Sequence, residues 1–122
     1  MLSKAEEKIM KILWKQKSAF MKDIMNALPD PKPAKTTVST LLKRMIEKDM
    51  VKFVMRGNVR EYKPNIARKT YFGKRMAELK SNLFNDSNMQ FASFFTKNSN
   101  LSISELEEIQ KLINEEIEKK KK

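Results

Sequence analysis

The stretch from Lys35 to Met50, KTTVSTLLKRMIEKDM, constrains the fold most because its residues separate into two faces at helical spacing. Apolar side chains recur at i, i+3, i+4 and i+7, as in a helix that buries one stripe. They are Val38, Leu41, Leu42 and Met45. The other face carries a polar line formed by Thr36, Thr40, Lys43 and Glu47. Short hydroxyl side chains can bond phosphates or base edges and let a helix approach a groove closely. An ordinary amphipathic helix is the alternative, although a solvated face more often carries Glu–Lys pairs at i, i+4.

Two helices are expected before this stretch. Ser3 and Glu6 have the spacing of a capping box, so a helix is expected to begin there. The helical pattern is interrupted by three prolines, which favour an extended connection into the stretch that begins at Lys35. They are Pro29, Pro31 and Pro33. The expected elements are a helix over residues 1–17, an extended segment over residues 17–20 and a short helix over residues 21–28.

A β-hairpin is expected after this stretch. Residues 50–55 are rich in Val and Phe, Gly57-Asn58 is a hairpin turn signal, and residues 59–62 return before Pro64. An isolated hairpin is marginally stable, so this one must pack on the helices. The order of three helices and a basic hairpin predicts a winged helix-turn-helix over residues 1–73, in which the hairpin is the wing.

The C-terminal part, residues 74–122, is expected to form short amphipathic helices separated by polar breaks. Its apolar side chains are too dense for so small a segment to bury alone, and two copies can bury what one cannot. We therefore expect a helical dimerisation region and a homodimer; the alternative is that these residues fold back on the winged domain. The candidate dimer contacts are Leu83, Phe84, Phe91, Phe94, Phe95, Leu106, Ile109 and Ile113. The expected fold class is mainly α with a small β-hairpin wing.

The positive charge is confined to the N-terminal part. Residues 1–74 carry 18 lysines and arginines against 7 aspartates and glutamates, whereas residues 75–122 carry eight of each. Basic charge on one module favours a polyanion as partner. The candidate residues for binding double-stranded DNA are Lys32, Lys35, Thr36, Thr37, Ser39, Thr40, Lys43, Arg44, Arg56 and Arg60. For Arg44 the alternative is an ion pair with Glu47 or Glu61.

Several function classes are disfavoured by composition. The chain has no cysteine and no histidine, which removes the usual general base and the commonest metal ligands. We expect no catalytic residues, no metal and no cofactor. No apolar run approaches the roughly 18 residues of a membrane span, so no membrane insertion and a cytoplasmic location are expected. A winged-helix adaptor that binds protein instead of DNA is the alternative function, and RNA binding is a third, which the scarcity of stacking aromatics near residues 35–50 disfavours.

The chain resembles the penicillinase and methicillin-resistance repressors in an ordered set of short motifs. These motifs lie in the opening helix, the expected reading helix, the turn and wing that follow, and the C-terminal region. They are Leu2–Glu6, Ile9-Met10, Leu13-Trp14, Thr36–Val38, Thr40–Met45, Lys48–Val51, Tyr62–Pro64, Phe84–Ser87, Leu101-Ser102 and Glu105-Leu106.

This resemblance implies a homodimeric repressor on a palindromic operator ahead of resistance genes. It also implies release by a membrane sensor-protease that cleaves the C-terminal region before a Phe, near Phe94-Phe95, in a segment expected between two short helices. Phe94 stands where those family members carry Asn, and Asp49 stands where Gly is usual. Pro31 and Pro33 are not typical of the family. Its copper-responsive branch holds metal with cysteines and is excluded because this chain has none.

Overall fold

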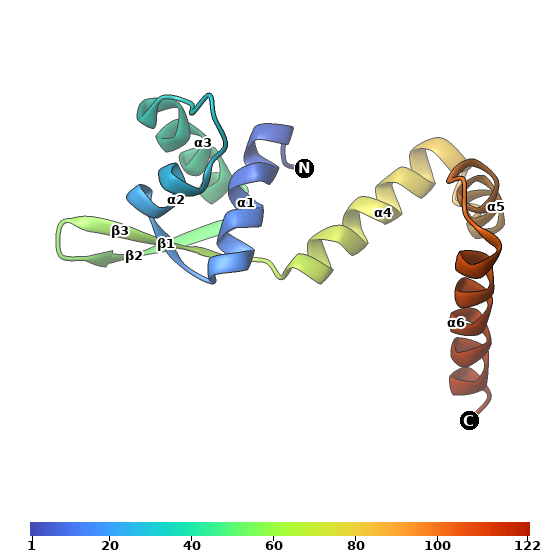
Figure 1. Cartoon of the computed structure of the whole chain (residues 1–122). Helices are drawn as coiled ribbons and strands as arrows, with labels where there is room; N and C mark the ends of the chain where they lie inside the picture. The colour runs from blue at the N-terminus through green and yellow to red at the C-terminus, as the bar shows by residue number, and fades with distance from the viewer. The chain divides into compact units, whose positions relative to one another are not determined.

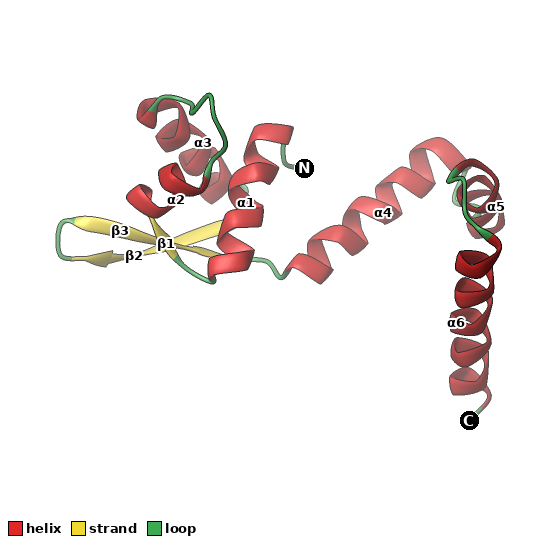
Figure 2. Ribbon diagram, in the orientation of Figure 1, coloured by secondary structure: helices red, strands yellow, loops and turns green.

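All 122 residues are described in a computed structural model, which contains six helices and a three-stranded antiparallel sheet (Figures 1 and 2). The elements are α1 (Lys4–Gln16), β1 (Ala19–Phe20), α2 (Met21–Ala27), α3 (Lys35–Glu47), β2 (Val51–Arg56), β3 (Val59–Pro64), α4 (Arg68–Phe84), α5 (Asn88–Asn98) and α6 (Ile103–Lys121). The chain divides into two compact units, Met1–Arg75 and Met76–Lys122. The predicted fold class, mainly α with a β-hairpin wing, is confirmed.

The core of the first unit is formed by the apolar stripes of α1, α2 and α3 and by the base of the sheet. Its fully buried side chains are Ile9, Met10, Leu13, Ile24, Val38, Leu42, Met45 and Val51. Of the stripe predicted on α3, only Leu41 is half-buried rather than buried. The opposite face of α3 is exposed along its length, so its inner face is fixed by packing and its outer face is free.

The hairpin belongs to a sheet with strand order β1-β3-β2. The extended segment predicted before α2 becomes β1 and pairs with β3, so the wing is a three-stranded sheet at its base and a two-stranded ribbon beyond it. Arg56 pairs with Val59 across the two-residue turn, and Gly57 has a φ of 63°. The ribbon ends in this turn, which lies away from the helices in Figure 1.

The N-terminus of α1 is tied to the C-terminus of α3. Ser3 and Glu6 form the predicted capping box, with the Ser3 amide donating to Glu6 Oε1 at 2.8 Å. Glu6 is only 2% exposed and also accepts from Lys48 Nζ at 2.8 Å. Burial raises the pKa of Glu6, but the hydrogen bonds from Lys48 and Ser3 outweigh it, so the net pKa is lowered. The carboxylate is therefore charged at neutral pH and braces two helices.

The first turns of α4 pack on α1 and belong to the first unit. Trp14 Nε1 donates to the Ile66 carbonyl at 2.9 Å, and the indole packs against the core at the end of α1. Tyr71 is buried, and its hydroxyl donates to Glu7 Oε2 at 2.8 Å. Burial and this hydrogen bond raise the pKa of Tyr71. Arg75 lies 3.7 Å from the same Glu7 carboxylate.

The second unit consists of the rest of α4 together with α5 and α6. Ser87 caps α5, and Ser102 with Glu105 forms a capping box at the start of α6. No residue of α5 or α6 is buried. No helix of the chain has both the length and the apolar character needed to cross a membrane.

The expected cleavage segment is placed differently from the sequence-based expectation. Phe94 and Phe95 lie inside α5, with the helix continuing to Asn98, and not between two helices. The expectation was wrong because the helix that begins at the Ser87 cap runs through this segment without a break, with the side chains of Thr96 and Asn98 donating to carbonyls of the preceding turn. Both Phe side chains are exposed, at 56% and 43%.

Candidate nucleic-acid interface

The outer face of α3 is the centre of the candidate interface. Thr36, Thr40 and Lys43 are exposed and follow one another at i, i+4 and i+7, so they share a line along the helix. Ser39 and Lys35 are exposed on the side of this line. The line therefore combines two hydroxyls and an ammonium, groups that together can bond base edges and phosphates.

The N-terminus of α3 has no side-chain cap. Its capping residue is Ala34, whose side chain cannot accept a hydrogen bond from the first amides. The unsatisfied amides of a helix N-terminus favour an anion, and Lys35 adds a cation beside them. This end of α3 is therefore suited to a phosphate group.

The Thr40 hydroxyl is already used as a donor. Its Oγ1 donates to the Thr36 carbonyl at 3.0 Å, one turn earlier in α3. The hydroxyl oxygen can then only accept a further bond, and the methyl group remains available for apolar contact. In the major groove these two groups match an amino donor of cytosine or adenine and the methyl group of thymine.

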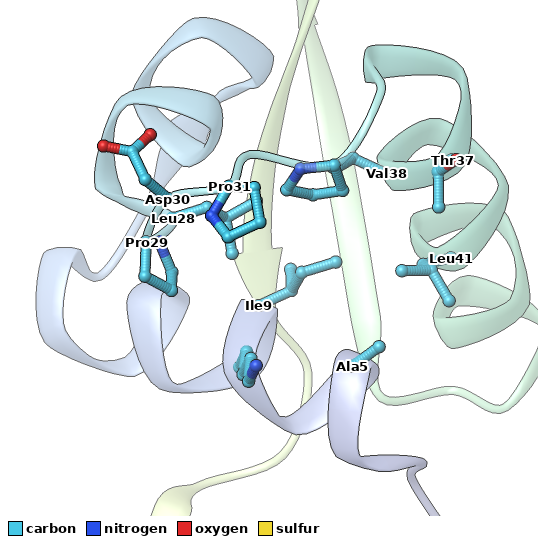
Figure 3. A pocket seen from close by; sticks show the side chains of 11 residues that line it. Ala5, Ile9, Leu28, Pro29, Asp30, Pro31, Thr37, Val38 and Leu41 are labelled. Atoms are coloured by element: carbon cyan, nitrogen blue, oxygen red, sulfur yellow. The ribbon is translucent and has the colours of Figure 1, made fainter.

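Thr37 and Arg44 lie beside the line formed by Thr36, Thr40 and Lys43. Thr37 is one turn before Leu41, and both line a hollow of about 340 Å³ between α1, the proline-rich loop and α3 (Figure 3). Thr37 is thus placed toward this hollow, away from the centre of the line. Arg44 is exposed and forms neither of the two ion pairs considered for it, with Glu47 or Glu61.

Lys32 is engaged at the end of α2. Its Nζ donates to the carbonyls of Met25 at 2.9 Å, Asn26 at 3.3 Å and Leu28 at 2.6 Å. Cations are favoured at helix C-termini because carbonyls there lack partners. In this structure Lys32 caps α2, and a phosphate contact would have to replace these bonds.

The two wing arginines have different surroundings. Arg56 Nε lies 3.3 Å from Glu61 Oε1, and Lys63 Nζ lies 3.8 Å from the same oxygen. The Arg60 guanidinium instead lies over the Phe53 ring, 4.2 Å from its centroid. The sequence-based set of site residues omitted Glu61 and Phe53. The two-residue turn could have revealed both, because it fixes the register that pairs Val54 with Glu61 and Phe53 with Tyr62.

Five of the eight candidate dimer residues line an apolar hollow in the second unit. Phe84 lies 5.5 Å, between ring centroids, from both Phe91 and Phe94. The hollow is about 620 Å³ and is lined by Met76, Leu79, Leu83, Phe84, Phe91, Phe94, Phe95 and Ser99. The other three candidates are on α6, where Leu106 and Ile113 are exposed and Ile109 is half-buried. No group of three or more His, Cys, Asp or Glu side chains is placed to hold a metal ion.

A three-helix core with a basic wing and an exposed, hydroxyl-lined third helix defines the winged-helix class of repressors. The chain matches the family described as "Penicillinase repressor" over residues 2–115. It belongs to this family.

Relatives and a solved structure agree with this assignment. The chain is 26% identical to a penicillinase repressor of Bacillus licheniformis over 98% of this chain and 94% of that protein. It is 28% identical to a penicillinase repressor of Staphylococcus aureus over 93% of this chain and 91% of that protein. It is also similar to the solution structure of the DNA-binding domain of the repressor BlaI, with 30% identity and a TM-score of 0.52. That match covers 58% of this chain and 88% of the domain.

Proposed function

We propose that this protein is a sequence-specific transcriptional repressor that binds a palindromic DNA operator as a homodimer. The observation that carries the proposal is the outer face of α3, where Thr36, Thr40 and Lys43 are exposed in one line beside an uncapped helix N-terminus. Such a face can enter the major groove of B-DNA, which admits an α-helix. The relatives named as penicillinase repressors and the DNA-binding domain of BlaI support the same role.

The homodimer is supported by the apolar surface of the second unit. Leu83 is 68% exposed and Leu112 59%, and the aromatic hollow beside Phe84 is open. A solvated helix rarely carries so many exposed apolar residues unless a partner covers them. A two-fold partner of identical sequence would place two copies of α3 on two half-sites, as a palindromic operator requires.

Antibiotic-resistance or related genes are the proposed targets, because the named relatives are penicillinase repressors. Release by proteolysis near Phe94-Phe95, through a membrane sensor-protease, is proposed from the family resemblance. Because that bond lies inside α5, a protease needs α5 to open locally before it can cut. No element of the chain itself is proposed to enter a membrane, and the protein is proposed to act in the cytoplasm.

The alternative, a winged-helix adaptor that binds a protein, is favoured by one observation. Val54, Met55 and Val59 on the wing are 40%, 53% and 54% exposed. Apolar side chains are common in the core of protein–protein interfaces. The adaptor predicts no specific binding to duplex DNA.

The test selects duplex DNA from a random pool with the full chain and then footprints the selected sequence and the region upstream of the protein's own gene. A palindromic consensus and two protected half-sites about one helical turn, or a multiple of it, apart are expected. Selected duplexes that share no consensus sequence, together with no protected region in the footprint, would support the adaptor. As a matched control, Thr40→Ala combined with Lys43→Ala should lose the footprint without changing the fold, because both side chains are exposed.

A further inference from the structure

Arg60 and Lys52 are the wing cations that lie in no ion pair, and of the two only Arg60 is held against an aromatic ring. Its guanidinium carbon is 4.2 Å from the centre of the Phe53 ring, well inside the roughly 6 Å reach of a cation–π contact. Arg56, by contrast, is 3.3 Å from Glu61, which also attracts Lys63. Arg56 is thus tethered to a carboxylate within the ribbon, whereas Arg60 is held in place without a carboxylate partner.

Phe53 is a fixed platform for this arginine. It pairs with Tyr62 across the ribbon, and the two ring centroids are 6.3 Å apart. Tyr62 is buried in the core and therefore anchors the Phe53 ring from one side. Phe53 itself remains 36% exposed. Stacking occupies the flat face of a guanidinium and leaves the N–H groups at its edge free to donate.

The cross-strand neighbour of Arg60 is apolar. This neighbour, Met55, is 53% exposed, whereas Val59, the preceding residue of β3, lies on the opposite face of the ribbon. Gly57 at the turn has no side chain, and no atom lies within 4 Å of the place where a Cβ would stand. A contact made only with phosphates would be expected to have polar neighbours, whereas an apolar neighbour fits the sugar walls of a groove.

We propose that Arg60, positioned by Phe53, enters the minor groove beside the major-groove site of α3 and favours A·T pairs there. The inference rests on the proposed function, since it requires duplex DNA under α3. A·T-rich minor grooves are narrow and carry a strong negative potential that attracts arginine. The amino group of guanine, in contrast, projects into the groove of a G·C pair. Phe53 is a positioning residue, and Arg56 is a brace within the ribbon.

The experiment uses the full chain and three duplexes that differ only at the base pairs under the wing of the selected operator. These pairs are A·T, G·C or inosine·C. Inosine·C resembles G·C in the major groove but lacks the minor-groove amino group, so it separates readout in the two grooves. We expect A·T and inosine·C to bind equally, and G·C to bind at least about fivefold more weakly, at the lower end of the usual cost of one wrong base pair.

Four variants locate this preference. Arg60→Gln should bind the three duplexes equally, while its matched control Arg56→Gln should keep the preference. Phe53→Leu should weaken binding to the A·T duplex by about two- to fivefold, the range expected for an exposed cation–π contact, and Phe53→Tyr should restore it. Thermal unfolding of each variant checks the fold, and the Tyr variant keeps the test valid even if Leu destabilises the wing.

Several results would overturn the proposal. One is equal affinity for A·T and G·C, and another is an inosine·C duplex that behaves like G·C, because readout would then lie in the major groove. If Arg56→Gln lost the preference for A·T and Arg60→Gln kept it, the minor-groove contact would belong to Arg56. A chain that binds no duplex at all overturns the proposed function together with this inference, whereas tight binding without any A·T preference overturns only the inference.

Discussion

Replacing Glu6 by Gln is expected to destabilise the winged domain at neutral pH. Gln keeps the shape and can still accept from the Ser3 amide, but it removes the charge opposite Lys48, 2.8 Å away. A hydrogen bond to a charged group contributes about 1.5–3 kcal/mol and a neutral one about 0.5–1.5 kcal/mol. Breaking a fully buried ion pair costs about 3–5 kcal/mol. The Lys48 side chain is 38% exposed and can be hydrated, so the expected loss is about 1–2 kcal/mol.

The pH dependence of this loss follows from the lowered pKa of Glu6. Burial alone would raise the pKa, but the bonds from Lys48 and Ser3 outweigh it. A carboxyl group with a pKa below its unfolded value stabilises the fold at neutral pH, and that contribution disappears as the pH falls through the folded pKa. The difference between wild type and Glu6→Gln should therefore be full at pH 7 and shrink toward zero below about pH 4.

Urea unfolding followed by far-UV circular dichroism measures this difference at each pH. Glu105→Gln is the matched control, because Glu105 has the same capping-box role at α6 but is exposed and has no lysine partner. Its bonds to Ser102 lower the pKa of Glu105 as well, but its replacement should leave the unfolding of the winged domain unchanged. The reasoning is refuted if Glu6→Gln is as stable as wild type at pH 7, or if its deficit persists undiminished in acid.

Three further predictions concern the reading helix, the core and the second unit. Thr40→Ala should cost about 1–3 kcal/mol of binding free energy on the operator and little on random duplex DNA. Thr40→Val should bind the operator as tightly as wild type only if the Thr40 methyl group makes the contact. Filter binding of each variant to both DNAs distinguishes these outcomes. Leu42→Ala should lower the free energy of unfolding by about 2–5 kcal/mol, since Leu42 is 1% exposed, and a denaturation midpoint unchanged by it would contradict the core assignment. A fragment of residues 1–75 should stay folded, sediment as a monomer and bind the operator 10²–10⁴-fold more weakly, the usual scale of avidity; a monomeric fragment that binds as tightly as the full chain would show that dimerisation is not needed.

Local signals in the sequence were sufficient for much of the fold. Ser3 with Glu6 begins α1 as predicted, and the same spacing in Ser102 and Glu105 marks the start of α6. Asp49, which stands where Gly is usual in the family, has a φ of 60°, as a residue after a helix end requires. These features depend on residues three or four positions apart, which is why sequence reasoning could find them.

Contacts between distant residues could not be predicted. Lys48 pairs with Glu6, 42 positions away, and Trp14 donates to Ile66, 52 positions away. Lys32 was predicted to be a DNA-binding residue, and nothing in the sequence indicated that its ammonium donates to carbonyls at the end of α2. Which cations remain available for DNA depends on such contacts, so the charge count identified the basic module but not the individual contact residues.

The salt dependence of operator binding by the full chain tests the central claim most directly. If the winged domains of a homodimer neutralise several phosphates each, log K should fall linearly with log[salt], with a slope of about −0.9 per phosphate and several units in total. Titrations at fixed salt should give two protomers per duplex. A slope near zero, or saturation at one protomer per full operator, would contradict a dimeric repressor that binds duplex DNA.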